Sequence, residues 1–257
     1  MSETTNSGGY GLSAAGAGGT IIAPVLPYLP PRPRSYRPKI ALIGCGGISE
    51  YHLRAYREMG LEVVAVCDRN VARAEKRRLE FFPEAAVCTD YHELLRRDDI
   101  EVVDVALHPA QRVVAIEAAI RAKKHVLSQK PFVHDLEVGE RLVALAEAQG
   151  VKLAVNQNGR WAPHFSYMAA ALHAGVIGEV ASVDFTLQWD HTWTAGTAFE
   201  EIHHLVLFDF GIHWFDMAAR FMRGQRAERV WASVRPTAFQ EMKPPMLGQV
   251  TIDYPGA

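Results

Sequence analysis

Residues 39–49 read Lys-Ile-Ala-Leu-Ile-Gly-Cys-Gly-Gly-Ile-Ser, and the organisation of the chain is best understood outward from them. Residues 40–43 are apolar without polar alternation, which indicates a strand buried on both faces. Glycines follow at once, and a helical pattern begins near Ile48. A strand that turns through glycines into a helix aims unpaired backbone N–H groups at one point. That point suits a phosphate, because the helix dipole also favours negative charge there.

The glycines follow the dinucleotide-binding pattern G-x-G-x-x-G, with Ser49 as a small residue in the third position. Gly44 permits the tight turn, and Gly46 lets a pyrophosphate approach the backbone. We therefore expect Gly44, Gly46, Gly47 and Ile48 to bind a dinucleotide. The alternative is a glycine turn without a ligand, since such turns are common.

A second buried run, 63–67, is followed directly by Asp68, which lies 22 residues beyond Gly46. A carboxylate at this spacing accepts hydrogen bonds from the adenosine ribose hydroxyls and repels a 2′-phosphate. This favours NAD over NADP as the cofactor. Arg69, the next residue, keeps NADP possible, because a guanidinium can hold the extra phosphate. The alternative role of Asp68 is to cap a helix.

The composition of the 257 residues is that of an ordinary globular protein, with 49% hydrophobic and 22% charged residues. The formal net charge of −2 gives no reason to expect nucleic acid or an anionic membrane as a partner. No apolar run reaches the length of a membrane span. The three cysteines lack zinc-ligand spacing and indicate reduced thiols in the cytoplasm. His203 and His204 near Glu200 show no metal-binding pattern, so no metal is expected.

Between residues 38 and 157, buried strands alternate with amphipathic helices, which predicts an α/β domain with a doubly wound parallel sheet. The expected strands are 39–43, 62–67, 86–88, 101–107, 125–129 and 151–157. The expected helices are 48–59, 70–82, 90–97, 110–122 and 135–149. Ligands bind at the carboxyl ends of such strands. His108, Gln129 and Lys130 lie at these ends, and we expect them at the cofactor.

From residue 158 the pattern changes to that of an α+β domain, 158–257, with a mostly antiparallel open sheet. We expect helices at 162–174 and 201–223, and strands at 180–189, 228–235 and 247–254. An open sheet that ends so soon leaves a bare edge, so the sequence is expected to be incomplete at its C-terminus. A homodimer or homotetramer through this sheet is also expected. Residues 1–37 are predicted to be a disordered or extended arm, because they are rich in Gly, Ser and Pro.

Lys130 and His213 are the candidate catalytic residues. Lys130 ends a predicted strand beside the expected nicotinamide, where its pKa should be lowered and proton transfer or hydrogen bonding to an oxygen becomes feasible. In the predicted second long helix, Asp209 lies one turn before His213, so its carboxylate can orient the imidazole and make it a general base. The alternatives are a solvated surface lysine and a solvent-facing polar stripe that continues through Asp216 and Arg220.

The loop 188–199 contains Trp189 and Trp193 among polar residues. Tryptophan rings can stack on the C–H faces of a sugar while neighbouring polar groups bind its hydroxyls. The same two rings can equally pack a domain interface, and the sequence does not separate these roles.

Gln129-Lys130-Pro131, Asn158-Gly-Arg160 and the Asp-x-x-x-His of residues 209–213, together with the glycine loop, resemble the glucose–fructose oxidoreductase / inositol dehydrogenase / rhizopine catabolism (Gfo/Idh/MocA) family. The resemblance runs from about residue 38 to the end of the chain. It implies that the lysine contacts cofactor and substrate oxygen, that the histidine accepts the hydroxyl proton and that Asp209 orients it. By the same resemblance Asn158, Arg160, Asp209 and His213 are candidate substrate contacts, and Trp193 is a further candidate because its ring could stack on a sugar.

The resemblance implies an NAD(P)-dependent dehydrogenase that acts on a secondary alcohol of a sugar or cyclic polyol. One departure is Gln129, because the family usually has Glu before Lys-Pro, and the lost carboxylate would change the pKa of Lys130. Two alternatives remain: a glycosidase that recycles bound NAD, and a sugar- or NAD-sensing regulator without catalysis. Members of the family are commonly longer than this chain, in agreement with the expected truncation.

Overall fold

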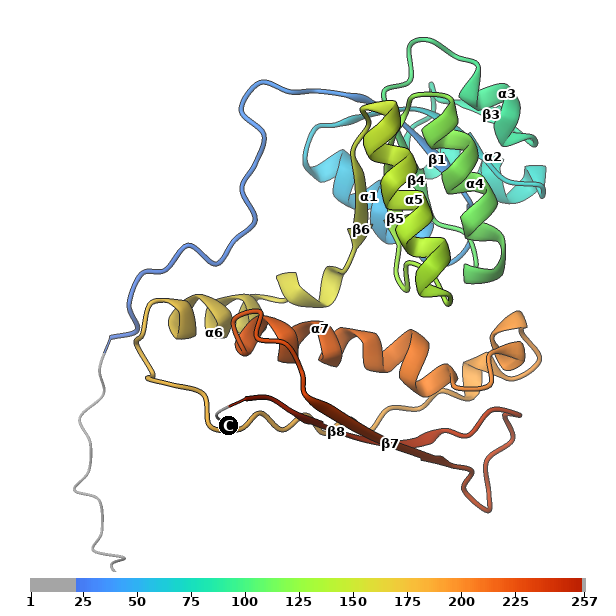
Figure 1. Ribbon diagram of the computed structural model, residues 1–257. Coiled ribbons are helices and arrows are strands. Elements are labelled where there is room, and N and C mark those ends of the chain that lie inside the picture. The colour runs from blue at the N-terminus through green and yellow to red at the C-terminus, as the bar shows by residue number, and fades with distance from the viewer. Residues whose placement is uncertain (1–21, 256–257) are drawn as a thin grey trace, which may run out of the picture.

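The computed structural model describes residues 22–255, and most of the predicted arm, residues 1–21, lies outside them. The chain forms an N-terminal α/β unit and a C-terminal unit, with the long helices of the second unit running beneath the first (Figure 1). The described N-terminal residues, 22–38, are extended and cross from the first strand to the C-terminal unit. There Tyr28 packs edge-on against Tyr167, and its carbonyl accepts a hydrogen bond from Ser166.

Six parallel strands form the N-terminal sheet in the order β3-β2-β1-β4-β5-β6, which is the strand order of a Rossmann fold. This confirms the predicted doubly wound sheet. The strands are β1 (Lys39–Ile43), β2 (Glu62–Cys67), β3 (Ala86–Cys88), β4 (Val102–Val105), β5 (His125–Gln129) and β6 (Leu153–Asn156). The order reverses between β1 and β4, so the loops after these strands face a common crevice at their carboxyl ends.

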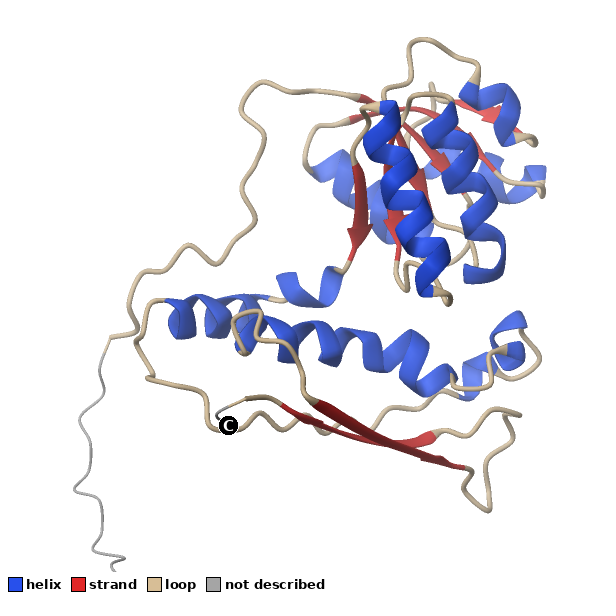
Figure 2. Cartoon of the chain, viewed as in Figure 1, coloured by secondary structure: helices blue, strands red, loops and turns tan. Residues whose placement is uncertain are grey.

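Helices cover both faces of this sheet, with α4 and α5 on the face toward the viewer (Figure 2). They are α1 (Ser49–Glu58), α2 (Val71–Phe81), α3 (Tyr91–Leu95), α4 (Pro109–Arg121) and α5 (Leu136–Gln149). Two apolar clusters result. Ile43, Val103 and Ile116 belong to the cluster under α4 and α5, and Leu42 and Leu53 belong to the cluster under α1 and α2. The core therefore holds the strand ends rigidly beneath the crevice.

The C-terminal unit consists of a pair of long helical segments above a two-stranded antiparallel sheet. Its elements are η1 (Asn158–Trp161), α6 (Pro163–His173), η2 (Thr192–Thr194), η3 (Ala198–Glu201), the π-helix η4 (Val206–Gly211), α7 (Ile212–Phe221), β7 (Arg229–Arg235) and β8 (Leu247–Asp253).

One prediction for this unit is wrong and another holds in part. Residues 180–189 form no strand; Val180, Val183 and Phe185 pack against α6 and α7, but the segment has no strand paired with it within 22–255. The alternating pattern therefore marks which side chains are buried, although the backbone has no hydrogen-bonded strand partner. The predicted helix 201–223 is found from Leu205 to Phe221, but residues 206–211 of it form the π-helix η4, and a 3-10 turn and a loop stand before it.

Candidate active site

The loop between β1 and α1 is shaped for close approach by a ligand. Gly44 has φ +99°, and a Cβ there would lie 2.9 Å from the carbonyl carbon and oxygen of Ala106. A Cβ on Gly46 or Gly47 would meet no protein atom within 4 Å. The space in front of these two glycines is therefore open, while Gly44 is held against β4.

The first turn of α1 receives no hydrogen bond from a capping side chain, because its N-cap residue is Ile48. Asn70, Asp90, His108 and Asp135 cap α2, α3, α4 and α5, respectively. The N–H groups of Glu50 and Tyr51 bond to the carbonyls of Gly47 and Ile48, which leaves those of Ile48 and Ser49 available to a phosphate. An open glycine loop next to an uncapped helix fits the pyrophosphate of a dinucleotide.

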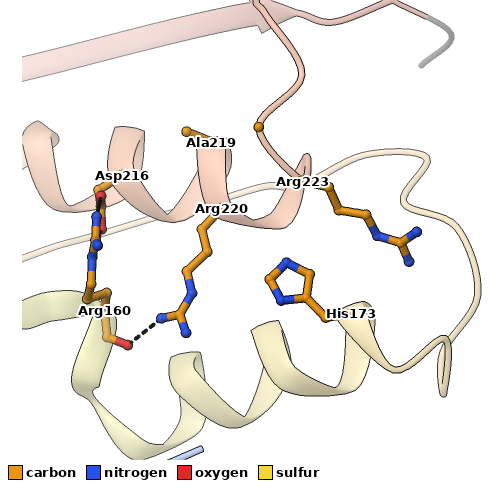
Figure 3. Close-up of a pocket in the computed structure, with 7 residues that line it drawn as sticks. Arg160, His173, Asp216, Ala219, Arg220 and Arg223 are labelled. Carbon is orange, nitrogen blue, oxygen red and sulfur yellow. Dashed lines mark hydrogen bonds and ion pairs between the residues drawn. The ribbon is translucent and has the colours of Figure 1, made fainter. Parts of the chain in front are cut away.

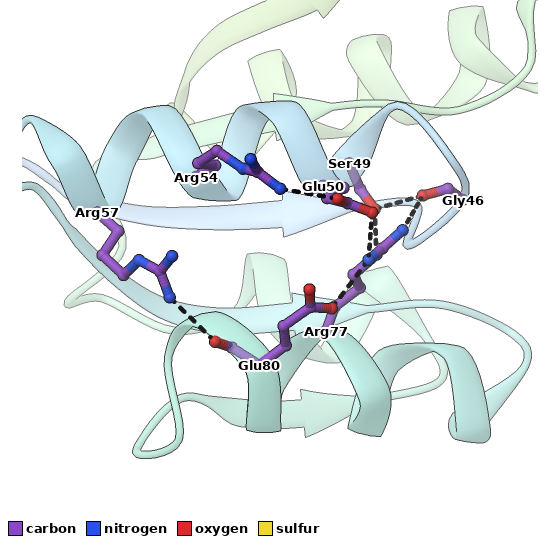
Figure 4. Close-up of polar contacts among 7 residues, drawn as sticks. All are labelled: Gly46, Ser49, Glu50, Arg54, Arg57, Arg77 and Glu80. Carbon is purple, nitrogen blue, oxygen red and sulfur yellow. Dashed lines mark hydrogen bonds and ion pairs between the residues drawn. The ribbon is translucent and has the colours of Figure 1, made fainter.

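Arg77 of α2, which the sequence did not single out, supports this loop from behind. Its guanidinium is only 8% exposed and donates to Ser49 Oγ at 3.2 Å and to the Gly46 carbonyl at 3.5 Å (Figure 4). Glu50 and Glu80 each accept a hydrogen bond from it at 3.1 Å. A buried guanidinium of this kind fixes the loop geometry without touching a ligand. Its only sequence signal was a basic residue on the face of an amphipathic helix.

Asp68 lies at the end of β2, beside the loop. Its Oδ2 accepts a hydrogen bond from the N–H of Cys45 at 2.8 Å, and its Oδ1 accepts one from the N–H of Asn70 at 2.8 Å. Each oxygen keeps a lone pair for a further donor such as a ribose hydroxyl. Asp68 therefore joins the glycine loop to the start of α2, and the side chain of its neighbour Arg69 is exposed.

Lys130, at the end of β5, forms an ion pair across the two units with Asp209 of η4. Its Nζ lies 3.1 Å from Asp209 Oδ2 and donates to the Asp209 carbonyl at 2.8 Å. Burial lowers the pKa of Lys130, and the charge and hydrogen bond of Asp209 offset part of that change. The sequence suggested that Gln129 leaves the lysine without a carboxylate neighbour; the C-terminal unit supplies one instead.

His213, in the first turn of α7, lies against Gly159 of η1. A Cβ on Gly159 would lie 2.8 Å from His213 Nδ1, so only glycine leaves room for the ring. His213 Nδ1 is buried and has no hydrogen-bond partner among the described residues. Burial and then the charge of Lys130 lower the pKa of His213, while Asp209 and Asp216 raise it less. The imidazole is therefore neutral near pH 7, as a proton acceptor must be.

The predicted arrangement of Asp209 and His213 differs in one respect. We expected the carboxylate to orient the imidazole, but among residues 22–255 Asp209 bonds to Lys130 and not to His213. The reason is the π-helix η4, whose wider turn changes the angle between the two side chains. Gln157 holds the start of α7 instead, because its Nε2 donates to the Ile212 carbonyl at 2.8 Å.

Two loops beside Lys130 are tied together by Arg112 of α4. This arginine is 2% exposed and donates to the carbonyls of Leu107 and Pro131. Burial lowers its pKa to about 10, and Asp209 offsets part of that change. His108 follows Leu107 and caps α4 through Nδ1, while its Nε2 is buried and without a partner within the described chain. Burial and then the charge of Arg112 lower the pKa of His108, and the charge of Asp209 offsets part of that change.

The other predicted substrate contacts, Trp193, Asn158 and Arg160, have different surroundings. Trp193 is half-exposed and packs near Phe210, whose ring centroid lies 6.0 Å from Lys130 Nζ. Asn158 is exposed at the start of η1. Arg160 pairs with Asp216 of α7 and lines a cavity of about 530 Å³ between α6 and α7 (Figure 3). The other polar residues lining that cavity are His173, Arg220 and Arg223.

Within residues 22–255, no group of three or more His, Cys, Asp or Glu side chains is arranged to hold a metal ion. In the same part of the chain, every helix is too short or too polar to cross a membrane. All three cysteines are free.

Comparison with known proteins supports the class of protein that this fold and site define. Residues 38–157 match the oxidoreductase family described as having an NAD-binding Rossmann fold, and residues 165–257 match the GFO/IDH/MocA C-terminal domain. The chain thus joins an NAD(P)-binding Rossmann domain to a second conserved domain. It belongs to the Gfo/Idh/MocA oxidoreductase family.

Among similar proteins, D-apiose dehydrogenase of Paraburkholderia graminis is 33% identical over 189 residues, which are 72% of this chain and 50% of that protein. The dTDP-3,4-didehydro-2,6-dideoxy-alpha-D-glucose 3-reductase of Actinomadura kijaniata is 34% identical over 205 residues, 77% of this chain and 59% of that protein. An oxidoreductase from Agrobacterium radiobacter, solved with NAD+, L-tartaric acid and magnesium, has a TM-score of 0.75 at 25% identity and covers 86% of this chain and 64% of that one. The chain thus spans about half the length of the curated relatives.

Proposed function

We propose that this protein is an NAD(P)-dependent dehydrogenase that acts on a secondary alcohol of a sugar or cyclic polyol. The observation that carries the proposal is the ion pair between Lys130 and Asp209 across the two units, with His213 in the next turn of the same helical segment. A cationic donor and a neutral imidazole near one another suit the removal of a hydroxyl proton. The relatives named for D-apiose and a deoxyglucose reduction agree with a carbohydrate substrate.

The cofactor would lie along the carboxyl edge of the sheet. Gly46, Gly47 and the first turn of α1 would hold the pyrophosphate, Asp68 the adenosine ribose, and His108 and Gln129 the region near the nicotinamide. When bound, NAD(P) accepts the hydride that the alcohol carbon loses. We propose NAD as the preferred form, because the Asp68 carboxylate would repel a 2′-phosphate.

The protein's own residues would handle the proton and the charge. The Lys130 ammonium would donate a hydrogen bond to the alcohol oxygen and stabilise the negative charge that develops as its proton leaves. His213 would accept that proton; its lowered pKa keeps it unprotonated near pH 7. Asp209 would keep Lys130 charged and in place, and Trp193 with Asn158 would border the sugar. The role of Arg160 would be to hold α7 through Asp216.

The test is an NADH fluorescence screen of the chain with NAD or NADP and a panel of sugars and inositols. We expect reduction of NAD with at least one of them, its loss in His213→Ala with NAD binding retained, and no change in His92→Ala, an exposed histidine of α3. Turnover without net NADH would favour the NAD-recycling glycosidase. Binding without turnover across the whole panel would favour the sensing regulator.

A further inference from the structure

A buried polar network adjoins Lys130 through Gln129, and the proposed proton transfer does not use its histidine. His52 of α1 is at its centre, 7% exposed, and Asp104 of β4 is fully buried. His52 Nδ1 lies 2.6 Å from Asp104 Oδ2, which also accepts a hydrogen bond from the Tyr56 hydroxyl at 2.7 Å. On the other side of the ring, Nε2 lies 3.2 Å from Gln129 Nε2 and 3.1 Å from Asn156 Nδ2. We call these five residues the His52 network.

The orientation of Gln129 determines which ring nitrogen of His52 carries the proton. The N–H of Lys130 donates to Gln129 Oε1 at 2.7 Å, so the NH2 end of the amide must face His52. An amide NH2 only donates hydrogen bonds, and therefore His52 Nε2 accepts and carries no proton. The single ring proton is on Nδ1, where it is donated to Asp104. Asn156 can turn either end of its amide toward the ring, but Gln129 cannot without releasing Lys130.

Opposing influences act on the charge of His52. Burial lowers its pKa, but the hydrogen bond and charge of Asp104 outweigh burial and raise it. A second proton on Nε2 would point at the NH2 of Gln129, so that two donors would face each other at about hydrogen-bond distance. The amide thereby opposes the second proton that the buried carboxylate on the far side of the ring favours.

The network connects the two ends of the proposed cofactor site. His52 follows the glycine loop by one turn of α1, and Gln129 ends β5 immediately before Lys130. A shift of the imidazole would therefore be passed to the backbone of Lys130, whose ammonium must reach Asp209 on the other unit. Misplacement of a reacting group by about 1 Å can reduce a rate by about a hundredfold.

We propose that His52, held as its neutral Nδ1–H tautomer by Asp104, is a positioning residue that fixes Gln129 and through it the backbone of Lys130. This rests on the proposed function, because Lys130 is the group that contacts the substrate oxygen there. We expect the His52 network to affect the rate of the chemical step more than the affinity of the cofactor, since Gln129 is its only member at the proposed cofactor site.

The first experiment needs no substrate. In the full chain labelled with 15N at histidine, the ring signals of His52, assigned by comparison with His52→Leu, are expected to show a neutral Nδ1–H tautomer at pH 7. The variant Gln129→Glu keeps an acceptor for the Lys130 N–H but places a carboxylate oxygen against His52 Nε2. It is therefore expected to convert His52 into an imidazolium at the same pH. A doubly protonated ring in the unaltered protein, or a neutral ring in Gln129→Glu, would overturn the proposal.

The second experiment measures kinetics with a substrate from the screen. We expect His52→Leu to lower kcat by about tenfold or more with the Kd for NAD changed less than about twofold. Lys124→Met is the matched control: Lys124 is 8% exposed and donates to the Arg97 carbonyl at 2.7 Å, before the opposite end of β5. It should lower Tm without changing kcat.

The outcomes separate the two proposals. If the unaltered chain reduces NAD and His52→Leu does so equally fast, the positioning role is wrong while the dehydrogenase stands. If the unaltered chain turns over no substrate, the dehydrogenase proposal fails and the tautomer measurement still decides the state of the His52 network. Should His52→Leu not fold, the ring signals of His52 are assigned from their change in Gln129→Glu, and a doubly protonated ring in the unaltered protein would still overturn the proposal.

Discussion

The ammonium of Lys130 and the carboxylate of Asp209 lie 3.1 Å apart although they belong to different units of the chain. The Asp209 carbonyl also accepts a hydrogen bond from the same ammonium at 2.8 Å. This double contact joins the end of β5 to η4. It places the cation of the Rossmann domain within electrostatic reach of His213, whose pKa it lowers.

Replacement of Asp209 by Asn is expected to move the pH profile of the proposed reaction toward acid on both sides. Asp209 raises the pKa of Lys130 and of His213, so removing its charge lowers both. His213 must be neutral, and the acid limb therefore moves to lower pH; Lys130 must be charged, and the alkaline limb moves the same way. The measurement is kcat/KM from pH 5 to 10. An alkaline limb that stays in place would show that Asp209 does not hold the charge on Lys130.

Gly159→Ala is expected to reduce kcat by about 10- to 100-fold, because its Cβ would lie 2.8 Å from His213 Nδ1 and displace the ring. The free energy of unfolding should fall only slightly, because alanine stabilises a helical backbone relative to glycine by about 0.5–1 kcal/mol. Steady-state kinetics, Tm and the Kd for NAD check this prediction together. A normal kcat in a folded variant would show that the His213 ring can adopt another position without loss of activity.

Asp68→Ser is expected to weaken NAD binding by about tenfold and to improve NADP relative to NAD. The variant removes the acceptor for the ribose hydroxyls and the charge that repels a 2′-phosphate, and it leaves Arg69 alone beside the site. Fluorescence titration with both cofactors gives the ratio. Asp90→Ser is a matched control, because Asp90 ends the segment after β3 and only caps α3. An unchanged NAD-to-NADP ratio in Asp68→Ser would exclude a role in cofactor choice.

Gly44→Ala and Gly46→Ala are expected to fail in different ways. Gly44 has φ +99°, and its Cβ would press on Ala106, so alanine there should lower the free energy of unfolding by about 1–3 kcal/mol. Alanine at Gly46 meets no protein atom and should leave stability unchanged while it weakens NAD binding by about tenfold or more. Urea denaturation and NAD titration separate the two effects. Normal NAD affinity in Gly46→Ala would remove the glycine loop from the binding site.

Much of the Rossmann domain could be predicted, because its signals are local. Buried runs mark the strands, and capping residues such as Asn70 and Asp135 mark the helix starts. The segment 180–189 was mispredicted because alternation shows which side chains are buried, whereas a strand also needs a distant backbone partner. The partner of Asp209 was mispredicted for a related reason. A π-helix changes the helical period locally, and the sequence carried no sign of it.

Within the site, individual residues were easier to predict than their pairing. Lys130 and His213 stood out through their positions, but Gly159 was only part of a motif until its contact with the imidazole was seen. His52 and Asp104 had no signal at all, since a histidine in a helix and an acid in a strand are each unremarkable alone. Their importance is visible only in the structure, where side chains from α1, β4, β5 and β6 meet in the core.

The π-helix η4 has a consequence for how this protein tolerates insertions and deletions. Each residue of an α-helix turns the chain by about 100°, so deleting one residue between 206 and 208 would restore a regular helix and rotate everything before the deletion. Ile202 and Leu205 would turn away from Phe210, with which they form one cluster, while Asp209, α7 and His213 stayed in place. Shortening by one residue would thus be more damaging here than most substitutions, because the spacing, more than the identity of Val206 or Leu207, keeps the segment before η4 packed against it.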